Sequence, residues 1–204
     1  MSNPSLNQTS EIIPISYPAR PLNGGALDVA LPKRGDWRAE PKYNGWRALV
    51  HVPTGAMFNR QLERLSIEKE FASAVAQASR LSLPEWIDCE ALDRRHNIGR
   101  GSLILLDLIV PTLTYTQRRE QLAALDLPSP FTPGMFLPGS LYLAPSYPNH
   151  EAEALYWSLQ QVNAGAGCDF YEGIVCKRAE RPYPIQRISA SRETADWIKH
   201  RWRA

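Results

Sequence analysis

From residue 37 onward, the hydrophobic positions fall mainly into short runs of the length and pattern typical of β-strands. Residues 46–52 form one such run. The turn residues 53–55 separate it from a return strand at 56–58, so we expect a hairpin. Residues 103–110 are almost continuously apolar, which predicts a strand buried on both faces. Further strands are expected at residues 86–92, 141–144, 173–177 and 196–201.

Three segments carry apolar residues at helical spacing or a residue suited to cap a helix. The first covers residues 66–80, with Ser66 as the expected N-cap. A second, short helix is expected from a cap at Thr116 to residue 125, and a third from a cap at Asn149 to about residue 162. Together with the strands, these helices predict an α+β fold built on antiparallel sheets.

The N-terminal residues differ in composition from the rest of the chain. Residues 1–20 are rich in Ser, Asn and Pro, and we expect them to form a flexible arm. Residues 21–204 then form one domain, a length that suits a single large domain or two small lobes.

The composition is that of an ordinary soluble protein, with 44% hydrophobic and 22% charged residues. The formal charge is only +2, so bulk charge does not attract nucleic acid, and such contact needs a local cluster of basic residues. The strongest local cluster in the sequence is His200-Arg201-Trp202-Arg203.

The three cysteines show no metal-binding spacing and are expected to be reduced thiols. No apolar run reaches the roughly 18 residues that span a bilayer, and the N-terminus lacks the pattern of a secretory signal. We therefore expect a cytoplasmic, monomeric protein with no membrane partner.

Short motifs carry the functional signal. The first is Glu40-Pro41-Lys42-Tyr43-Asn44-Gly45-Trp46-Arg47, which resembles the K-x-D-G-x-R signature of covalent nucleotidyltransferases, the superfamily of ATP-dependent DNA and RNA ligases and mRNA capping enzymes. Segments that match the remaining motifs of this family follow in the family's order. They are Phe58-Asn59-Arg60, Asp88-Cys89-Glu90-Ala91-Leu92, Leu105-Leu106-Asp107-Leu108-Ile109, Glu172-Gly173-Ile174-Val175-Cys176-Lys177 and Trp197-Ile198-Lys199. The resemblance spans residues 37–201.

The resemblance implies a two-lobed nucleotidyltransferase fold built on antiparallel sheets. This is the ATP-grasp-like fold of DNA ligase adenylation domains, and it implies that ATP binds between the sheets. It implies that Lys42 is the nucleophile that takes AMP from ATP. The implied metal ligands for Mg²⁺ or Mn²⁺ are Glu172 and Glu90. The residues implied to bind ATP are Glu40, Tyr43, Asn44, Arg47, Arg60, Glu90, Leu106, Lys177, Trp197 and Lys199.

The chemistry itself requires such a set of residues. An amine attacks phosphorus only when it is neutral, and an unperturbed lysine has a pKa of about 10.4. Nearby cations and partial desolvation lower that value. The negative charge on the phosphates also calls for fixed positive groups. Lys177 and Lys199 are the candidates for both roles.

The sequence departs from the family pattern in three places. Asn44 replaces the usual Asp, and Leu106 stands where ligases often place an aromatic residue against adenine. No segment matches the OB-fold domain that usually follows, so we expect a protein partner to replace it.

The expected substrate is nicked nucleic acid, with duplex DNA favoured because residues 116–122 resemble a helix of ATP-dependent DNA ligases. Two other readings remain open. One is an RNA ligase or a capping-type guanylyltransferase. The other is a non-catalytic nucleic-acid-binding or regulatory relic of a ligase.

Overall fold

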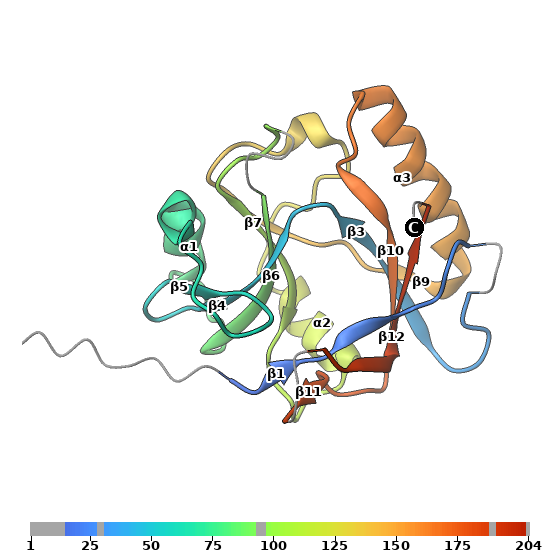
Figure 1. The fold of residues 1–204 in the computed structure, drawn as a ribbon, viewed down its shortest axis with the longest axis horizontal. Coiled ribbons are helices and arrows are strands. Elements are labelled where there is room, and N and C mark those ends of the chain that lie inside the picture. The colour runs from blue at the N-terminus through green and yellow to red at the C-terminus, as the bar shows by residue number, and fades with distance from the viewer. Residues whose placement is uncertain (1–14, 28–30, 93–96, 188–190, 203–204) are drawn as a thin grey trace, which may run out of the picture.

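The structure is a computed structural model that describes residues 15–27, 31–92, 97–187 and 191–202. Two five-stranded sheets form its framework, and a short two-stranded sheet pairs β1 (Tyr17–Pro18) with β11 (Ile185–Gln186) (Figure 1). Most strand pairs are antiparallel, as the sequence predicts. The pairs β7–β8 and β2–β12 are parallel, so both large sheets are mixed.

The first sheet has the strand order β5-β4-β6-β7-β8. These strands are Ala56–Phe58, Trp46–His51, Trp86–Leu92, Ser102–Leu108 and Leu141–Leu143, respectively. The predicted hairpin is therefore present as β4 and β5. Strand β7 is buried at all but one of its seven positions, which confirms the expectation of burial on both faces.

The second sheet has the strand order β2-β12-β10-β3-β9. Its strands are Arg20–Asn23, Glu193–Arg201, Tyr171–Arg178, Trp37–Tyr43 and Tyr147–Pro148. Of the predicted N-terminal arm, residues 1–14 lie outside the described residues. The described part of the predicted arm is not a free segment, because β1 and the start of β2 are paired strands.

Helices cover one face of each large sheet. Helix α3 (Ala152–Ala166) packs against β3 and β10, and its buried Leu155, Tyr156 and Leu159 join the core of the second sheet. Helix α1 (Ala72–Ala78) packs against β7 and β8 of the first sheet. Helix α2 (Tyr115–Ala123) also contacts β7. Lys42, Lys177 and Lys199 lie on the face of the second sheet opposite to Tyr43, which packs in the core with α3.

The helix boundaries correct the sequence predictions in detail. The expected helix at 66–80 is a 3₁₀ turn, η1 (Glu68–Phe71), followed by α1, and no side chain caps either element. The cap of α2 is Thr114, which forms a reciprocal capping box with Gln117. Thr116 instead donates its hydroxyl to the carbonyl of Ala179.

The third predicted helix begins with a 3₁₀ turn, η3 (Asn149–Glu151), and continues as α3 to Ala166. Gly167 ends it in the left-handed conformation, with φ of 63°, which glycine adopts without strain. A further 3₁₀ turn, η2 (Pro133–Met135), lies in the Pro-rich loop before β8. None of the helices in the described part of the chain has the length and apolar character needed to span a bilayer.

Candidate active site

Strand alternation and register bring three of the predicted lysines to one face of the second sheet. In the pairing of β3 with β10, Lys42 is opposite Gly173 and Glu40 is opposite Val175. In the pairing of β10 with β12, Val175 is opposite Lys199 and Lys177 is opposite Trp197. Directly paired residues point to the same side of a sheet, and so do residues two apart on one strand. Segments that lie more than 120 residues apart in the sequence therefore contribute to one surface.

A β-bulge places Glu172 beside Lys42. The register shifts between Tyr171 and Gly173, so Glu172 is the extra residue on β10. Gly173 has φ of 147°, and a Cβ at this position would lie 1.9 Å from the backbone oxygen of His200. Only glycine permits this close approach. As a result the Glu172 carboxylate accepts a short hydrogen bond from the Lys42 amine and forms an ion pair of 3.0 Å with Arg201.

Arg47 is almost fully engaged in holding the structure together. Its guanidinium donates to both carboxylate oxygens of Asp88, at 2.9 and 2.8 Å, to the hydroxyl of Tyr183 and to the carbonyl of Ala19. These bonds use four of the five N–H donors that an arginine has. Its side chain borders the cavity described below, but most of its hydrogen-bonding capacity is taken by protein groups.

Glu90 is a partly buried carboxyl group at the junction of the two sheets. Its Oε1 accepts a 2.8 Å hydrogen bond from the amide of Gly45, within the Lys42 motif. A Cβ on Gly45 would lie 2.6 Å from the carbonyl oxygen of Ala91, so a larger residue does not fit there. Burial raises the pKa of Glu90 to about 7, and nearby Glu172 adds to the rise, while Lys42 and the Gly45 amide oppose it.

This raised pKa predicts a pH-dependent stability that Glu90→Gln removes. The ordinary pKa is 4.5, so between that value and about 7 the folded protein binds more protons than the unfolded chain. The contribution of Glu90 to stability is therefore fully present below pH 4.5 and is lost as the pH rises through about 7. In thermal melts, we expect wild type to lose of the order of 2 kcal/mol relative to Glu90→Gln over that window. Parallel melting curves for the two proteins would contradict the assignment.

The two uncovered sheet faces enclose a cavity of about 530 Å³. Every residue that the sequence predicts for catalysis, ATP binding or metal binding lines this cavity, with the exception of Asn44. Asn44 instead donates its side-chain amide to the backbone carbonyl of Asp169, at 2.9 Å. Tyr43 borders the cavity, but its ring packs against Phe170 and Tyr171 in the core, because it is offset by one residue from Lys42 on the strand.

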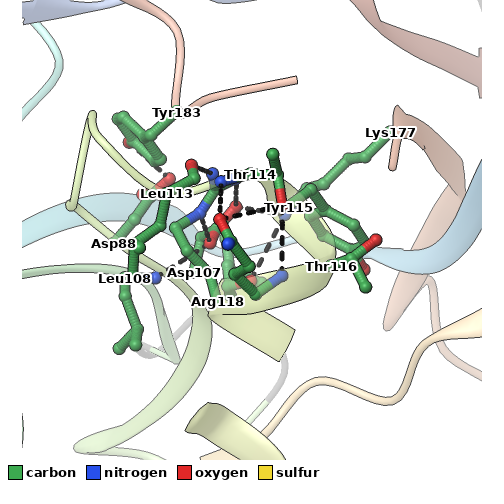
Figure 2. Close-up of polar contacts among 12 residues, drawn as sticks. Asp88, Asp107, Leu108, Leu113, Thr114, Tyr115, Thr116, Arg118, Lys177 and Tyr183 are labelled. Carbon is green, nitrogen blue, oxygen red and sulfur yellow. Dashed lines mark hydrogen bonds and ion pairs between the residues drawn. The ribbon is translucent and has the colours of Figure 1, made fainter. Parts of the chain in front are cut away.

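A buried ionic network forms the floor of the cavity. The Lys177 amine lies 2.8 Å from Glu40 and 3.3 Å from Asp107, and its side chain is only 4% exposed. Asp107 in turn accepts two hydrogen bonds from Arg118 of α2, at 2.6 and 3.1 Å, and Figure 2 shows this arrangement. Tyr115 donates its hydroxyl to Glu40 at 2.5 Å. Glu40 and Lys177 therefore face the cavity and are also held in place by protein partners.

Several of these residues were not predicted as functional. Arg201 lines the cavity, and the alternation of Trp197, Lys199 and Arg201 on one strand could have indicated it. Arg20 also lines the cavity, although it lies in the segment expected to be a flexible arm. Asp88, Asp107 and Arg118 carried no separate signal, because their roles depend on partners that are distant in the sequence.

The local charge of the cavity is clearly positive although the whole chain is nearly neutral. Seven basic side chains line it against four acidic ones, an excess of three positive charges. The described residues therefore gather their positive charge in this cavity, and Arg201 is the member of the predicted tail cluster that contributes to it. Of that tail, His200 is buried, Arg201 pairs with Glu172, and Arg203 lies outside the described residues.

The acidic residues of the cavity suit a metal ion that takes the rest of its ligands from water or from a bound molecule. No group of three or more His, Cys, Asp or Glu residues in the described ranges could hold a metal ion by itself. Glu90 and Glu172 both line the cavity and are close enough to raise the pKa of Glu90 by mutual repulsion. Mg²⁺ commonly uses one or two carboxylates together with phosphate oxygens and water, so this pair fits such an ion.

Comparison with solved structures shows which known proteins have this fold. The ligase domain of LigD from M. tuberculosis superposes with a TM-score of 0.60 and 19% identity, over 91% of this chain and 59% of that one. A mycobacterial DNA ligase D complexed with ATP and MES superposes with a TM-score of 0.60 and 18% identity, over 92% of this chain and 60% of that one. A Lig E DNA ligase superposes with a TM-score of 0.51 and 14% identity, over 90% of this chain and 68% of that one. No protein-family model and no curated protein sequence matches the chain.

These similarities establish the fold, since the identities are below 20%. The two-lobed nucleotidyltransferase fold of ligase domains, which the order of the motifs predicts, is confirmed. The chain spans about three fifths of the length of the two ligase D chains.

Proposed function

We propose that this chain acts as the nucleotidyltransferase domain of an ATP-dependent polynucleotide ligase, with Lys42 as the nucleophile. One observation carries the proposal. Lys42 lines a positively charged cavity, and its amine contacts the carboxylate of Glu172. Lys42 lies on the same sheet face as Lys177 and Lys199. A DNA ligase of the same fold has been solved in complex with ATP, which supports ATP as the nucleotide.

The proposed first step joins Lys42 to AMP. Lys42 Nζ gives up a proton, and Glu172, its hydrogen-bond partner, is the group placed to accept it. The freed electron pair forms a bond from nitrogen to the α-phosphorus of ATP, and the nitrogen then releases a second proton to water, which leaves the phosphoramidate N–H. The bond from that phosphorus to the bridging oxygen breaks, and pyrophosphate leaves with the electron pair.

Positive groups in the cavity stabilise the charge that develops on the phosphates. Lys199 and Arg201 are two residues apart on β12, so they face the same side of the sheet as Lys42. A divalent cation, Mg²⁺ or Mn²⁺, supplies further positive charge when bound with the nucleotide near Glu90 and Glu172. Because Lys177 is anchored by Glu40 and Asp107, its amine is held in place before the nucleotide arrives.

The proposed later steps transfer AMP to a 5′-phosphate and then seal a nick as a 3′-hydroxyl displaces AMP. We favour nicked duplex DNA as the substrate, because the solved structures with TM-scores above 0.5 include DNA ligases.

Labelled nucleotides test the proposal directly. The protein is incubated with Mg²⁺ and ATP that is radiolabelled in either the α- or the γ-phosphate, and with α-labelled GTP in parallel. We expect label on the protein only from α-labelled ATP. Label from GTP would favour a capping-type enzyme. No label from any nucleotide, with Mn²⁺ as well as Mg²⁺, would favour a non-catalytic relic. Chasing the labelled protein with nicked DNA or nicked RNA identifies the acceptor.

A further inference from the structure

We infer that two asparagine side chains, Asn163 in helix α3 and Asn44 after β3, are positioning residues that hold the Glu172 carboxylate against the Lys42 amine. Asn44 was expected to bind ATP, and Asn163 was not predicted to have a role. Neither residue lines the cavity, so both act through the strand that carries Glu172 and not through contact with a bound molecule. Because the proposed reaction uses the contact between Glu172 and Lys42, this inference rests on the proposed function.

The buried side chain of Asn163 pairs with both backbone groups of Tyr171. Its Nδ2 donates to the carbonyl of Tyr171 at 2.8 Å, and its Oδ1 accepts from the amide of Tyr171 at 3.0 Å. The described pairing of β10 with β12 ends at Gly173 and Arg201, and so does not reach Tyr171. A side-chain amide that donates to and accepts from one residue makes the two hydrogen bonds that a neighbouring strand would otherwise supply. Asn163 therefore fixes the backbone of Tyr171 at the end of the sheet.

The position of Glu172 depends on its two neighbours, because it is the extra, unpaired residue of the bulge. On one side, Gly173 approaches the backbone of His200 so closely that no side chain fits there. On the other side, Tyr171 is held by Asn163. The direction of the Glu172 side chain is therefore set by two anchored residues, and one of these anchors is the side chain of Asn163.

Asn44 anchors the same segment from the end of β3. Its side-chain amide donates to the carbonyl of Asp169 at 2.9 Å, and its backbone amide donates to the carbonyl of Phe170, also at 2.9 Å. Two asparagines from separate elements thus hold residues 169–171, the three residues before the bulge. A carboxylate at either position could not donate to the carbonyl that it faces, and it would repel that carbonyl oxygen.

Three Asn→Asp substitutions provide a matched set, because each removes one side-chain donor to a backbone carbonyl. Asn163→Asp and Asn44→Asp weaken the hold on residues 169–171. Asn149→Asp is the control. Asn149 lies outside the cavity in η3, and its side chain donates to the carbonyl of Pro32 at 2.9 Å. Thermal melts show which variants are folded, and if Asn163→Asp is not, Asn44→Asp takes its place in every measurement below.

We expect Asn163→Asp to slow the transfer of AMP to the protein by about tenfold, since small misplacements of reacting groups have effects of this scale or larger. Arg201 still pairs with Glu172 in this variant, so the carboxylate is displaced and not lost. The ATP concentration that gives half the maximal rate should stay the same, because Asn163 lies outside the cavity. Asn149→Asp should transfer AMP at the wild-type rate.

A double-mutant cycle with Glu172→Gln separates positioning from a general loss of structure. Glu172→Gln slows the transfer by itself, because an amide does not take up the proton that a carboxylate accepts. If Asn163 acts through Glu172, adding Asn163→Asp to Glu172→Gln changes the rate by less than about twofold. A second loss of about tenfold in the double variant would contradict the inference, and so would wild-type transfer by a folded Asn163→Asp protein.

A small acylating reagent tests the same contact without ATP. Such a reagent modifies neutral amines, and a carboxylate in contact with an amine favours the protonated form. Glu172→Gln and Asn163→Asp should therefore both raise the rate at which Lys42 is modified, followed by mass spectrometry of the digested protein, while the exposed Lys69 reacts as in wild type. If these rates rise but wild type never retains AMP, only the proposed function fails. If wild type retains AMP on Lys42 but neither rate depends on Asn163, only the positioning role fails.

Discussion

Replacing Lys42 with arginine is expected to abolish the transfer of AMP to the protein while leaving the protein folded. The guanidinium keeps the positive charge and can still pair with Glu172, so the cavity keeps its electrostatic balance. It cannot act as a nucleophile, because arginine is not deprotonated in proteins. We expect retention of AMP to fall by more than about a thousandfold, the scale seen when a nucleophile is removed from an enzyme. Labelling with α-labelled ATP measures this directly.

Lys69→Arg is the matched control for this prediction. Lys69 is exposed and lies outside the cavity, so its replacement makes the same chemical change without touching the site. It should label like wild type, and thermal melts should show all three proteins folded. Undiminished labelling of Lys42→Arg would show that another residue is the nucleophile.

Replacing Arg118 with methionine is expected to destabilise the protein by about 3–5 kcal/mol, because it leaves a buried charge without its main partner. Arg118 is fully buried, and it contacts both carboxylate oxygens of Asp107 and the carbonyl of Leu113. Without it, Asp107 keeps the hydrogen bond from the amide of Leu108, at 2.9 Å, and the longer contact to Lys177, at 3.3 Å. Since Asp107 also anchors Lys177, the folded fraction should retain less AMP. Urea unfolding measures the change in stability.

The neighbouring Arg119→Met is the control for Arg118. It removes the same type of side chain from the same helix, but no ion pair is found for Arg119 among the described residues. Arg119 is only partly buried, although its charge acts on Tyr43 and Tyr115, so we expect a loss of about 1 kcal/mol, smaller than that of Arg118→Met. Equal destabilisation by the two substitutions would indicate that α2 tolerates neither change for reasons unrelated to Asp107.

The sequence predicts the framework of this site well, because its strands alternate regularly. Residues 173–177 and 196–201 are predicted as strands, whereas the strand that carries Lys42, β3, is not, and only the order of the motifs relates it to them. The antiparallel register then brings Lys42, Lys177 and Lys199 to one face. The bulge that turns Glu172 toward Lys42 cannot be predicted from the sequence, because it depends on the close approach of Gly173 to the backbone of His200.

The partners of the buried charges could not be predicted from local patterns. Arg47 was expected to contact ATP, yet it mainly holds Asp88, Tyr183 and Ala19. Lys177 was expected to act on the Lys42 amine and on the phosphates, and its contacts to Glu40 and Asp107 were not predicted. The Lys177–Asp107 contact joins the two sheets, and the Arg47 bonds join residues that are distant in the sequence, so none of them follows from a single segment.

The N-terminal segment shows the limit of composition as a guide. Its Ser, Asn and Pro content is typical of disorder, but Ala19 and Arg20 are fixed by backbone hydrogen bonds to residues 184 and 192. Pairing with a distant strand therefore overrides local composition, and it makes Arg20 part of the cavity.

The most direct test of the account is to locate AMP on the protein. Wild type is incubated with ATP and Mg²⁺, its intact mass is measured, and proteolytic fragments are then analysed by tandem mass spectrometry. We predict a mass gain of one AMP, carried by Lys42 through its side-chain nitrogen. AMP on Lys177, Lys199 or any other residue, or no gain with either Mg²⁺ or Mn²⁺, would contradict the account.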